Sequence, residues 1–431
     1  MPRIIAFLLS IISFFTSLFG ASDGNLPVAD DDFVPVIRFF ACSDTHVTEN
    51  YEQSERAGRI TKLFNLAYDF AESNPYYTKL DAALFVGDCT DNGKDKEFEI
   101  FDAEIKAGIR EETTLLAIAA NNHDGYIGKS CLEKISEITG LDSDFHVVIN
   151  GYHFIGISCS ATENAHYSPY QRVWLRQQLK EASADDPNKP IFVCHHEHVL
   201  ESVYGSDILD QWGNLYFKDI LACYPQVVHF SGHSHYPLND PRSIAQIGFT
   251  TIGTGSMSYA EYRYGIDIKI RPEGNGRCAQ AWIVEADANN NIRLTGIDVN
   301  DGGILCQYVL PTTCESSERV FTKANIFKIS SAPKFAEDAT LTVTDNNDGT
   351  YTVIAPAAES TDGFVVFSYR IRVYDKLGIQ THTEEIVNDY FLNVSRSETV
   401  FTIDAKPGYS IEVTAENSCY MSSEALCATI V

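Results

Sequence analysis

Residues 82–93 read AALFVGDCTDNG, and this stretch decides the fold. The apolar run Ala82–Val86 has the composition of a buried strand, and Gly87 and Asp88 follow it directly. An acidic residue just after a buried strand lies at the carboxyl end of that strand, where open α/β sheets gather their ligands. Other apolar runs of the chain end in the same way.

Four further strand-like runs end in residues that bind metals. Val36–Cys42 precedes SDTH (43–46), Leu115–Ala119 precedes NNHD (121–124), Ile191–Cys194 precedes HH (195–196) and Val227–Phe230 precedes SGHSH (231–235). Imidazole and carboxylate groups bind zinc, manganese and iron, and so many ligands exceed the needs of one tetrahedral ion. Because one carboxylate can bridge two ions about 3.5–4 Å apart, the five strand ends predict a two-metal site.

Helix-like segments separate these strand-like runs. Residues 53–73 place Ile60, Leu63 and Phe64 at helical spacing, and residues 170–182 carry a second apolar face. Strands that alternate with helices are typical of an α/β architecture. The N-terminal three quarters of the chain are therefore predicted to form an α/β domain.

The pattern changes after about residue 312. Residues 335–431 contain short β-rich runs such as LTVT and YTVI, and Asn347-Asp348-Gly349 predicts a hairpin turn between them. Helical periodicity is absent from this part, so we expect a small all-β sandwich. The predicted domains are a signal peptide at 1–22, an α/β domain at 23–315 and a β-module at 330–431.

The N-terminal segment and the charge limit the class of protein. Residues 1–22 contain Arg3, a long apolar run and then small residues, as a secretory signal peptide does; an uncleaved anchor is the alternative. We therefore expect a secreted or cell-envelope protein with no transmembrane segment once the signal is removed. The net charge of −27 makes a basic nucleic-acid groove improbable.

The cysteines divide into two kinds. Cys42, Cys89, Cys159 and Cys194 lie in or beside apolar runs and are interpreted as buried small hydrophobic residues. Cys419 and Cys427 lie close together and are the pair we expect to be bridged. No CxxC spacing occurs, which argues against a thiolate zinc site or a dithiol redox centre.

The five motifs together resemble the calcineurin-like metallophosphoesterase family. They are SDTH (43–46), GDCTDNG (87–93), NNHD (121–124), HH (195–196) and GHSH (232–235), and residues 87–101 are similar to the branch that contains phosphodiesterases. The resemblance covers about residues 34–300. It implies a four-layer αββα sandwich with a binuclear centre of two divalent or transition metal ions, such as Mn, Fe or Zn.

The resemblance also implies which residues bind each ion. Asp44, His46 and His235 would bind the first ion, Asn122, His195 and His233 would bind the second, and Asp88 would bridge them. Neighbouring residues on an extended backbone point to opposite sides, so only one of His195 and His196 can bind easily. The family position selects His195.

Two residues of the third motif are candidates for the acid–base chemistry. His123 is the candidate proton donor to the leaving group, or a phosphate contact, and a structural histidine is the alternative. Asp124 is expected to orient His123, as carboxylates often do for histidines. The remaining polar residues of the motifs are interpreted as fixing the turn after the bridging carboxylate (Asp91 and Asn92) or as structural (His198 and His229).

These expectations favour an exported metal-dependent phosphoesterase that prefers phosphodiesters to monoesters. In the mechanism that the resemblance implies, a hydroxide between the two ions attacks phosphorus. The substrate would be a small-molecule, lipid or nucleotide phosphoester. The alternative is a non-catalytic binding or adhesive protein that uses an immunoglobulin- or fibronectin-III-like C-terminal module for a carbohydrate or protein ligand. The intact ligand set argues against this alternative.

Overall fold

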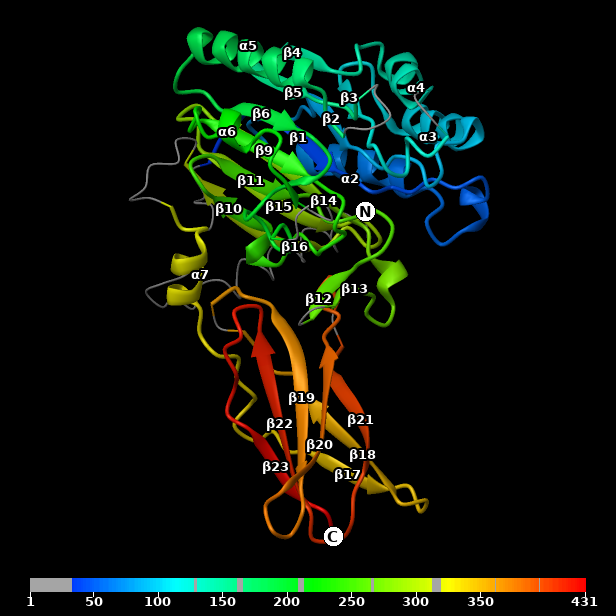
Figure 1. The fold of residues 1–431 in the computed structure, drawn as a ribbon, viewed down its shortest axis with the longest axis vertical. Helices are drawn as coiled ribbons and strands as arrows, with labels where there is room; N and C mark the ends of the chain where they lie inside the picture. Colours follow the sequence, from blue (N-terminus) through cyan, green and yellow to red (C-terminus); the bar gives the residue numbers. More distant parts are fainter. Residues whose placement is uncertain are drawn as a thin grey trace. The chain divides into compact units, whose positions relative to one another are not determined.

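The computed structural model describes residues 33–127, 130–160, 166–207, 213–264, 267–311, 319–360, 362–394 and 396–431. The described chain divides into two compact units, with the boundary between Lys323 and Ala324. The first unit is an α/β domain and the second is an all-β domain (Figure 1). The predicted signal peptide at residues 1–22 lies outside the described residues.

The first unit contains a mixed sheet in the order β16-β15-β14-β1-β2-β3. Its strands are β1 (Pro35–Cys42), β2 (Ala82–Val86), β3 (Thr114–Ile118), β14 (Gln280–Asp287), β15 (Ile292–Asp298) and β16 (Ile304–Leu310). Strands β1, β2 and β3 are parallel, and β14 runs antiparallel to β1. The carboxyl ends of the three parallel strands therefore lie at one edge of the sheet.

A second six-stranded sheet of the same unit has the order β10-β11-β9-β6-β5-β4. Its strands are β4 (Phe145–Ile149), β5 (Tyr152–Gly156), β6 (Ile191–Cys194), β9 (Val227–Ser231), β10 (Ile244–Gln246) and β11 (Thr250–Gly253). Strands β5, β6, β9 and β11 are parallel to one another. Two small two-stranded sheets join β7 (His198–Val199) to β8 (Gly213–Asn214) and β12 (Tyr262–Tyr264) to β13 (Asp267–Ile270).

Alternating side chains of β1 explain how the two sheets and the helices form layers. Phe39 faces the second sheet, with its ring centroid 5.0 Å from that of Phe154 and 4.8 Å from that of Phe192. Its neighbour Phe40 points the other way, to Phe64 of helix α2 (Arg59–Ser73) at 5.0 Å. Because successive side chains of a strand alternate between faces, one strand serves two apolar cores.

Helices cover the outer faces of both sheets. Helices α2, α3 (Asp95–Gly108) and α4 (Ser130–Thr139) bury their apolar sides against the first sheet. Helices α5 (Pro169–Asp185) and α6 (Lys218–Leu221) pack on the second sheet (Figure 1). The first unit is thus the expected αββα sandwich. Short 3₁₀ helices occur at Tyr51–Gln53, Pro241–Ser243 and Asn275–Arg277.

The second unit is a two-sheet β-sandwich, preceded by the short helix α7 (Lys323–Ile329), which spans the unit boundary. One sheet has the order β17-β18-β21 and the other β20-β19-β22-β23. The strands are β17 (Thr342–Asp345), β18 (Thr350–Pro356), β19 (Val366–Tyr374), β20 (Gln380–Val387), β21 (Glu398–Asp404), β22 (Ser410–Asn417) and β23 (Leu426–Thr429). The predicted hairpin turn joins β17 to β18, with Asn347 and Gly349 both at positive φ.

The cysteine prediction for this unit is wrong. Cys419 is buried in the turn after β22, whereas Cys427 is exposed on β23, and the structure does not join them in a disulfide. Cys427 lies opposite Glu412 in the strand ladder, so its side chain faces away from the core. Closeness in the sequence did not reveal on which face each thiol lies.

Within the described residues, no helix combines the length and the apolar character that crossing a bilayer requires.

Candidate metal centre

Five residues that follow the strands have left-handed backbone conformations. They are Asp44 (φ 54°), His46 (φ 43°), Asp88 (φ 49°), His233 (φ 75°) and His235 (φ 57°). A non-glycine residue in this region is strained by about 1–3 kcal/mol and persists only where its surroundings hold it. Such residues cluster at functional sites, and these five are all predicted metal ligands.

Hydrogen bonds between the loops hold this strained backbone. The N–H groups of Asp44 and His46 donate to the carbonyl oxygens of Gly87 and Asp88, each at 3.1 Å. The N–H group of His233 donates to Asp44 Oδ2, also at 3.1 Å. The loops after β1, β2 and β9 therefore fix one another, and the two sheets together define the site.

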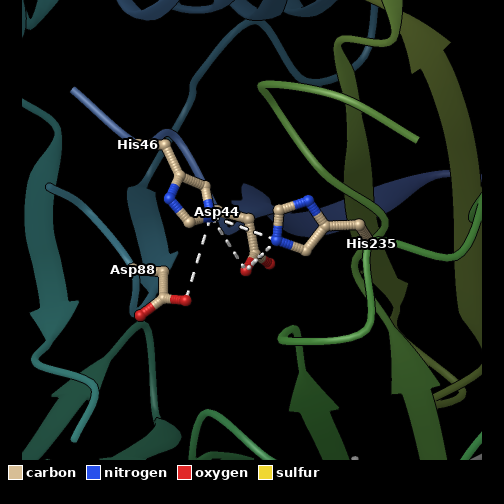
Figure 2. Close-up of side chains that lie close together, drawn as sticks. All are labelled: Asp44, His46, Asp88 and His235. Atoms are coloured by element: carbon tan, nitrogen blue, oxygen red, sulfur yellow. Dashed lines mark hydrogen bonds and ion pairs between the residues drawn. The ribbon is translucent and has the colours of Figure 1, made fainter. Parts of the chain in front are cut away.

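One group of ligand atoms comes from the loops after β1, β2 and β9. Asp44, His46, Asp88 and His235 each offer one atom, and these atoms lie within 4.8 Å of one another. The two imidazoles approach the Asp44 carboxylate from opposite sides (Figure 2). His235 Nε2 lies 3.2 Å from Asp44 Oδ1 and 3.1 Å from His46 Nε2. All four side chains are buried.

A second group adjoins the first through Asp88. It consists of Asp88, His196 and His233. His196 Nε2 lies 3.1 Å from Asp88 Oδ2, and Asn122 Nδ2 lies 3.0 Å from the same oxygen and 3.2 Å from His233 Nδ1. Asp88 therefore belongs to both groups, which is the position predicted for a bridging carboxylate.

The structure places His196, and not the predicted ligand His195, beside Asp88. His195 turns away from Asp88, and its Nδ1 atom lies 2.6 Å from His229 Nε2. The opposite face of the strand end instead brings His196 to Asp88, and His196 Nδ1 bonds the carbonyl oxygen of Val86 at 2.7 Å. Strand alternation predicted that only one of the two histidines would face the site, but it did not predict which one.

The charges of the two groups match the requirements of cations. Burial opposes the charged forms of His46 and His196, but the nearby carboxylates raise the pKa of His46 to about 9 and that of His196 to about 10. Burial likewise opposes ionisation of Asp44, yet the facing histidines hold its pKa well below the usual value. Two buried carboxylates therefore draw positive charge into the site.

Several buried polar atoms at the centre have no hydrogen bond, and one of them is a carboxylate oxygen. Asp88 Oδ1 is buried and has no hydrogen bond. An unpartnered buried carboxylate oxygen is costly, and a metal ion would satisfy it. Imidazole nitrogens, carboxylate oxygens and an amide oxygen are ligands that suit transition ions such as zinc, iron and manganese. The residues present therefore fit a pair of metal ions.

The third motif has His123 at the site, but Asp124 does not orient it. The His123 ring lies 4.2 Å from the His46 ring, and His123 Nδ1 lies 2.8 Å from the carbonyl oxygen of Asp91. The buried Asp124 carboxylate instead accepts from the N–H groups of Thr90 at 2.8 Å and Ala120 at 3.0 Å. Asp124 therefore ties the second and third motif loops together.

Asp91 has a role that the sequence analysis missed. It was interpreted as a turn residue, but its Oδ1 atom lies 3.3 Å from His46 Nδ1, the ring nitrogen that faces away from His235. A carboxylate at that nitrogen fixes the orientation and tautomer of the ring. The spacing of Asp91 three residues after Asp88 was the available signal.

Other side chains near the centre are structural supports. Both ring nitrogens of His198 lie within hydrogen-bond distance of hydroxyl groups, Ser231 Oγ at 2.8 Å and Ser234 Oγ at 2.7 Å. His229 is buried between His195 and Thr251. These contacts agree with the structural interpretation of both histidines. Tyr259, which the sequence analysis did not single out, packs against His235 at a tilt of 36°, with ring centroids 4.1 Å apart.

Comparisons with known proteins support this interpretation. The family model described as calcineurin-like phosphoesterase matches residues 37–237. A curated protein, "Probable glycerophosphodiester phosphodiesterase GpdQ" of Arcobacter nitrofigilis, is 26% identical over 203 residues, which are 45% of this chain and 70% of that protein.

Two solved structures show weaker likeness. Purple acid phosphatase PPD1 from yellow lupin has a TM-score of 0.46 and 12% identity, over 66% of this chain and 55% of that one. Phosphopantetheinyl Hydrolase (PptH) from Mycobacterium tuberculosis has a TM-score of 0.30 and 13% identity, over 54% of this chain and 91% of that one. The family match and the geometry of the strand ends agree, and residues 37–237 are therefore a member of the calcineurin-like phosphoesterase family, which makes this unit a hydrolase of phosphoester bonds.

Proposed function

We propose that this chain is an exported, metal-dependent phosphodiesterase. The similar protein from Arcobacter nitrofigilis is described as a glycerophosphodiester phosphodiesterase, which supports phosphodiesters as the substrate class. The basic residue and apolar run at 1–22 support export through a signal peptide. The single observation that carries the metal dependence is the buried Asp88 carboxylate, which two groups of ligand residues share.

We propose the following ligands for the two ions. Asp44, His46 and His235 would bind the first ion, Asn122, His196 and His233 would bind the second, and Asp88 would be shared by both. When bound, such a pair supplies Lewis acidity and an activated water for attack on phosphorus. The chain itself supplies rigid orientation: Asp91 holds the His46 ring, and the Tyr259 carbonyl oxygen lies 3.2 Å from His235 Nδ1.

His123 is the proposed proton donor to the leaving group. The His123 ring is half-buried, and this burial lowers its pKa. The carbonyl oxygen of Asp91 can only accept a hydrogen bond, so His123 Nδ1 carries the proton that it donates there. That contact directs the other ring nitrogen away from the loop. The other ring nitrogen carries a proton only in the protonated ring, and that imidazolium form can give its proton to a departing alkoxide and return to the neutral ring.

A His123→Ala variant tests this role through the leaving group. With an alkyl phosphodiester, whose alkoxide needs a proton, we expect kcat to fall about 10²–10⁴-fold. With bis-p-nitrophenyl phosphate, whose leaving group is stable as an anion, we expect less than about a tenfold loss. Steady-state kinetics on both substrates measure the difference. Equal losses on both substrates would rule out proton donation by His123.

Metal content and substrate preference test the proposed function directly. The native full-length protein is expected to contain two transition ions per chain by elemental analysis. After chelation and reloading with Mn, Zn or Fe, it should hydrolyse bis-p-nitrophenyl phosphate faster than p-nitrophenyl phosphate. If the protein contained no bound metal and added metal restored no hydrolysis, the proposal of a metal-dependent enzyme would be refuted. A preference for the monoester would refute the proposal of a phosphodiester substrate.

We also propose that the second unit is of the immunoglobulin or fibronectin-III type. Its sheets of three and four strands, with β19 and β22 adjacent in the larger one, support this assignment. The inward-facing residues of both sheets form one apolar core that includes Val353, Ile371 and Val413. Such modules serve as spacers or bind ligands, and none of the buried core residues contributes to the metal centre.

A further inference from the structure

Two cysteines from different elements meet near the segment that carries Asn122 and His123. Cys131 lies in the first turn of α4, and Cys159 lies three residues after β5. Their Sγ atoms are 3.9 Å apart, and the two residues are only 1% and 5% exposed. The other described sulfur contacts are of a different kind: Cys89 and Cys278, for example, approach backbone carbonyl oxygens.

We propose that Cys131 and Cys159 form a disulfide bond in the mature protein. Bonded sulfur atoms are about 2.05 Å apart, so each Sγ needs to move by only about 1 Å, which a modest side-chain rotation provides. Both thiols are enclosed, and each has the other as its sulfur neighbour. Cys159 is buried, as the sequence analysis expects, and the proposal adds a covalent partner to that position.

The bond would form by exchange with a small disulfide such as oxidised glutathione. One cysteine attacks that disulfide and releases a glutathione thiol, and the second cysteine then displaces the other glutathione from the mixed disulfide. The two protein thiols lose two electrons and two protons, one S–S bond is broken and one is formed. Contact with Cys131 and burial both raise the pKa of the Cys159 thiol, so the exchange belongs to folding and not to the finished fold.

The cross-link would have a local mechanical effect. The N–H group of Cys159 already donates to the carbonyl oxygen of Ala119 at 2.8 Å. A bond from Cys159 to Cys131 would therefore attach both ends of segment 119–131 to the same residue. Asn122 and His123 lie within this segment, so the bond would restrain the part of the centre that the third motif supplies.

Peptide mapping tests the bond itself, independently of the proposed function. The full chain is refolded with oxidised and reduced glutathione, alkylated in denaturant without reduction, digested and analysed by mass spectrometry. We expect the peptides of Cys131 and Cys159 to be linked, 2 Da lighter than the two thiol peptides together. Alkylation of both residues in soluble, refolded protein would overturn the proposal.

Thermal unfolding provides a second measurement with matched variants. We expect oxidised protein to unfold about 5 °C or more above reduced protein, because the cross-link closes a 28-residue separation. The double variant Cys131→Ala/Cys159→Ala should show no such difference, whereas Cys306→Ala, which removes another buried thiol, should retain it. If the oxidised double variant still unfolded at a higher temperature than the reduced one, other cysteines would be the cause, and the proposal would be overturned.

Discussion

An Asp88→Asn variant is expected to lose at least about 10³-fold in kcat/KM, equivalent to about 4 kcal/mol of transition-state stabilisation. Asp88 is the residue that both groups of ligands share, and its carboxylate is fully buried. The amide has the same shape but carries no negative charge, so it cannot hold two cations together. We therefore expect elemental analysis to find fewer than two ions per chain.

The same variant should keep its fold. Loss of the charge removes the largest attraction that raises the pKa of His196. Asp44 and Asp91 still face His46, so the protonated histidines keep a partner or can become neutral. Circular dichroism should be unchanged, and Asp69→Asn on the exposed side of α2 provides a control with the same chemical change and full activity. Near-normal turnover by a folded Asp88→Asn protein would contradict the bridging assignment.

A comparison of His195→Ala with His196→Ala is expected to separate the two neighbouring histidines. His196→Ala removes an atom that lies 3.1 Å from Asp88 Oδ2, so we expect loss of one ion and about a 10²–10³-fold fall in kcat. His195→Ala leaves both groups of ligand residues intact and should lower activity by less than about tenfold. Metal stoichiometry and steady-state kinetics measure both effects.

Stability separates a ligand role from a packing role. Both side chains are fully buried, so each truncation should lower the free energy of unfolding by about 1–3 kcal/mol. Only the His196 variant should combine that loss with a change in metal content. Loss of an ion in the His195 variant, with normal content in the His196 variant, would restore the assignment that the family position suggested.

The strands were predictable from sequence because each is a short apolar run with a polar end. The predicted run Val36–Cys42 corresponds to β1 (Pro35–Cys42), and Ala82–Val86 is β2 without any change. The start of the first helix was not predictable to the same degree. Helical periodicity begins at Gln53, but α2 begins at Arg59 because Gly58 adopts φ 73° and interrupts the helix.

The composition of the centre was predictable, but the directions of its side chains were not. Five strand ends meet because parallel strands of both sheets end at the centre, a property that the order of elements already implies. Whether His195 or His196 faces Asp88 depends on tertiary contacts, such as the hydrogen bond from His196 to Val86. The contacts of Asp91 and Asp124 have the same cause: Asp91 lies at a ring nitrogen of His46, and Asp124 accepts from the N–H group of Thr90, and both contacts arise only in the folded loops.

The five left-handed residues have a consequence for the lifetime of the protein. Their strain and the buried carboxylates weaken the fold until cations bind, since a ligand that binds only the native state stabilises it in proportion to the logarithm of its concentration. Metal supply would then determine the abundance of the enzyme as well as its rate. A chain without its ions would unfold more often and be removed by proteases, so scarcity of metal would clear inactive copies first.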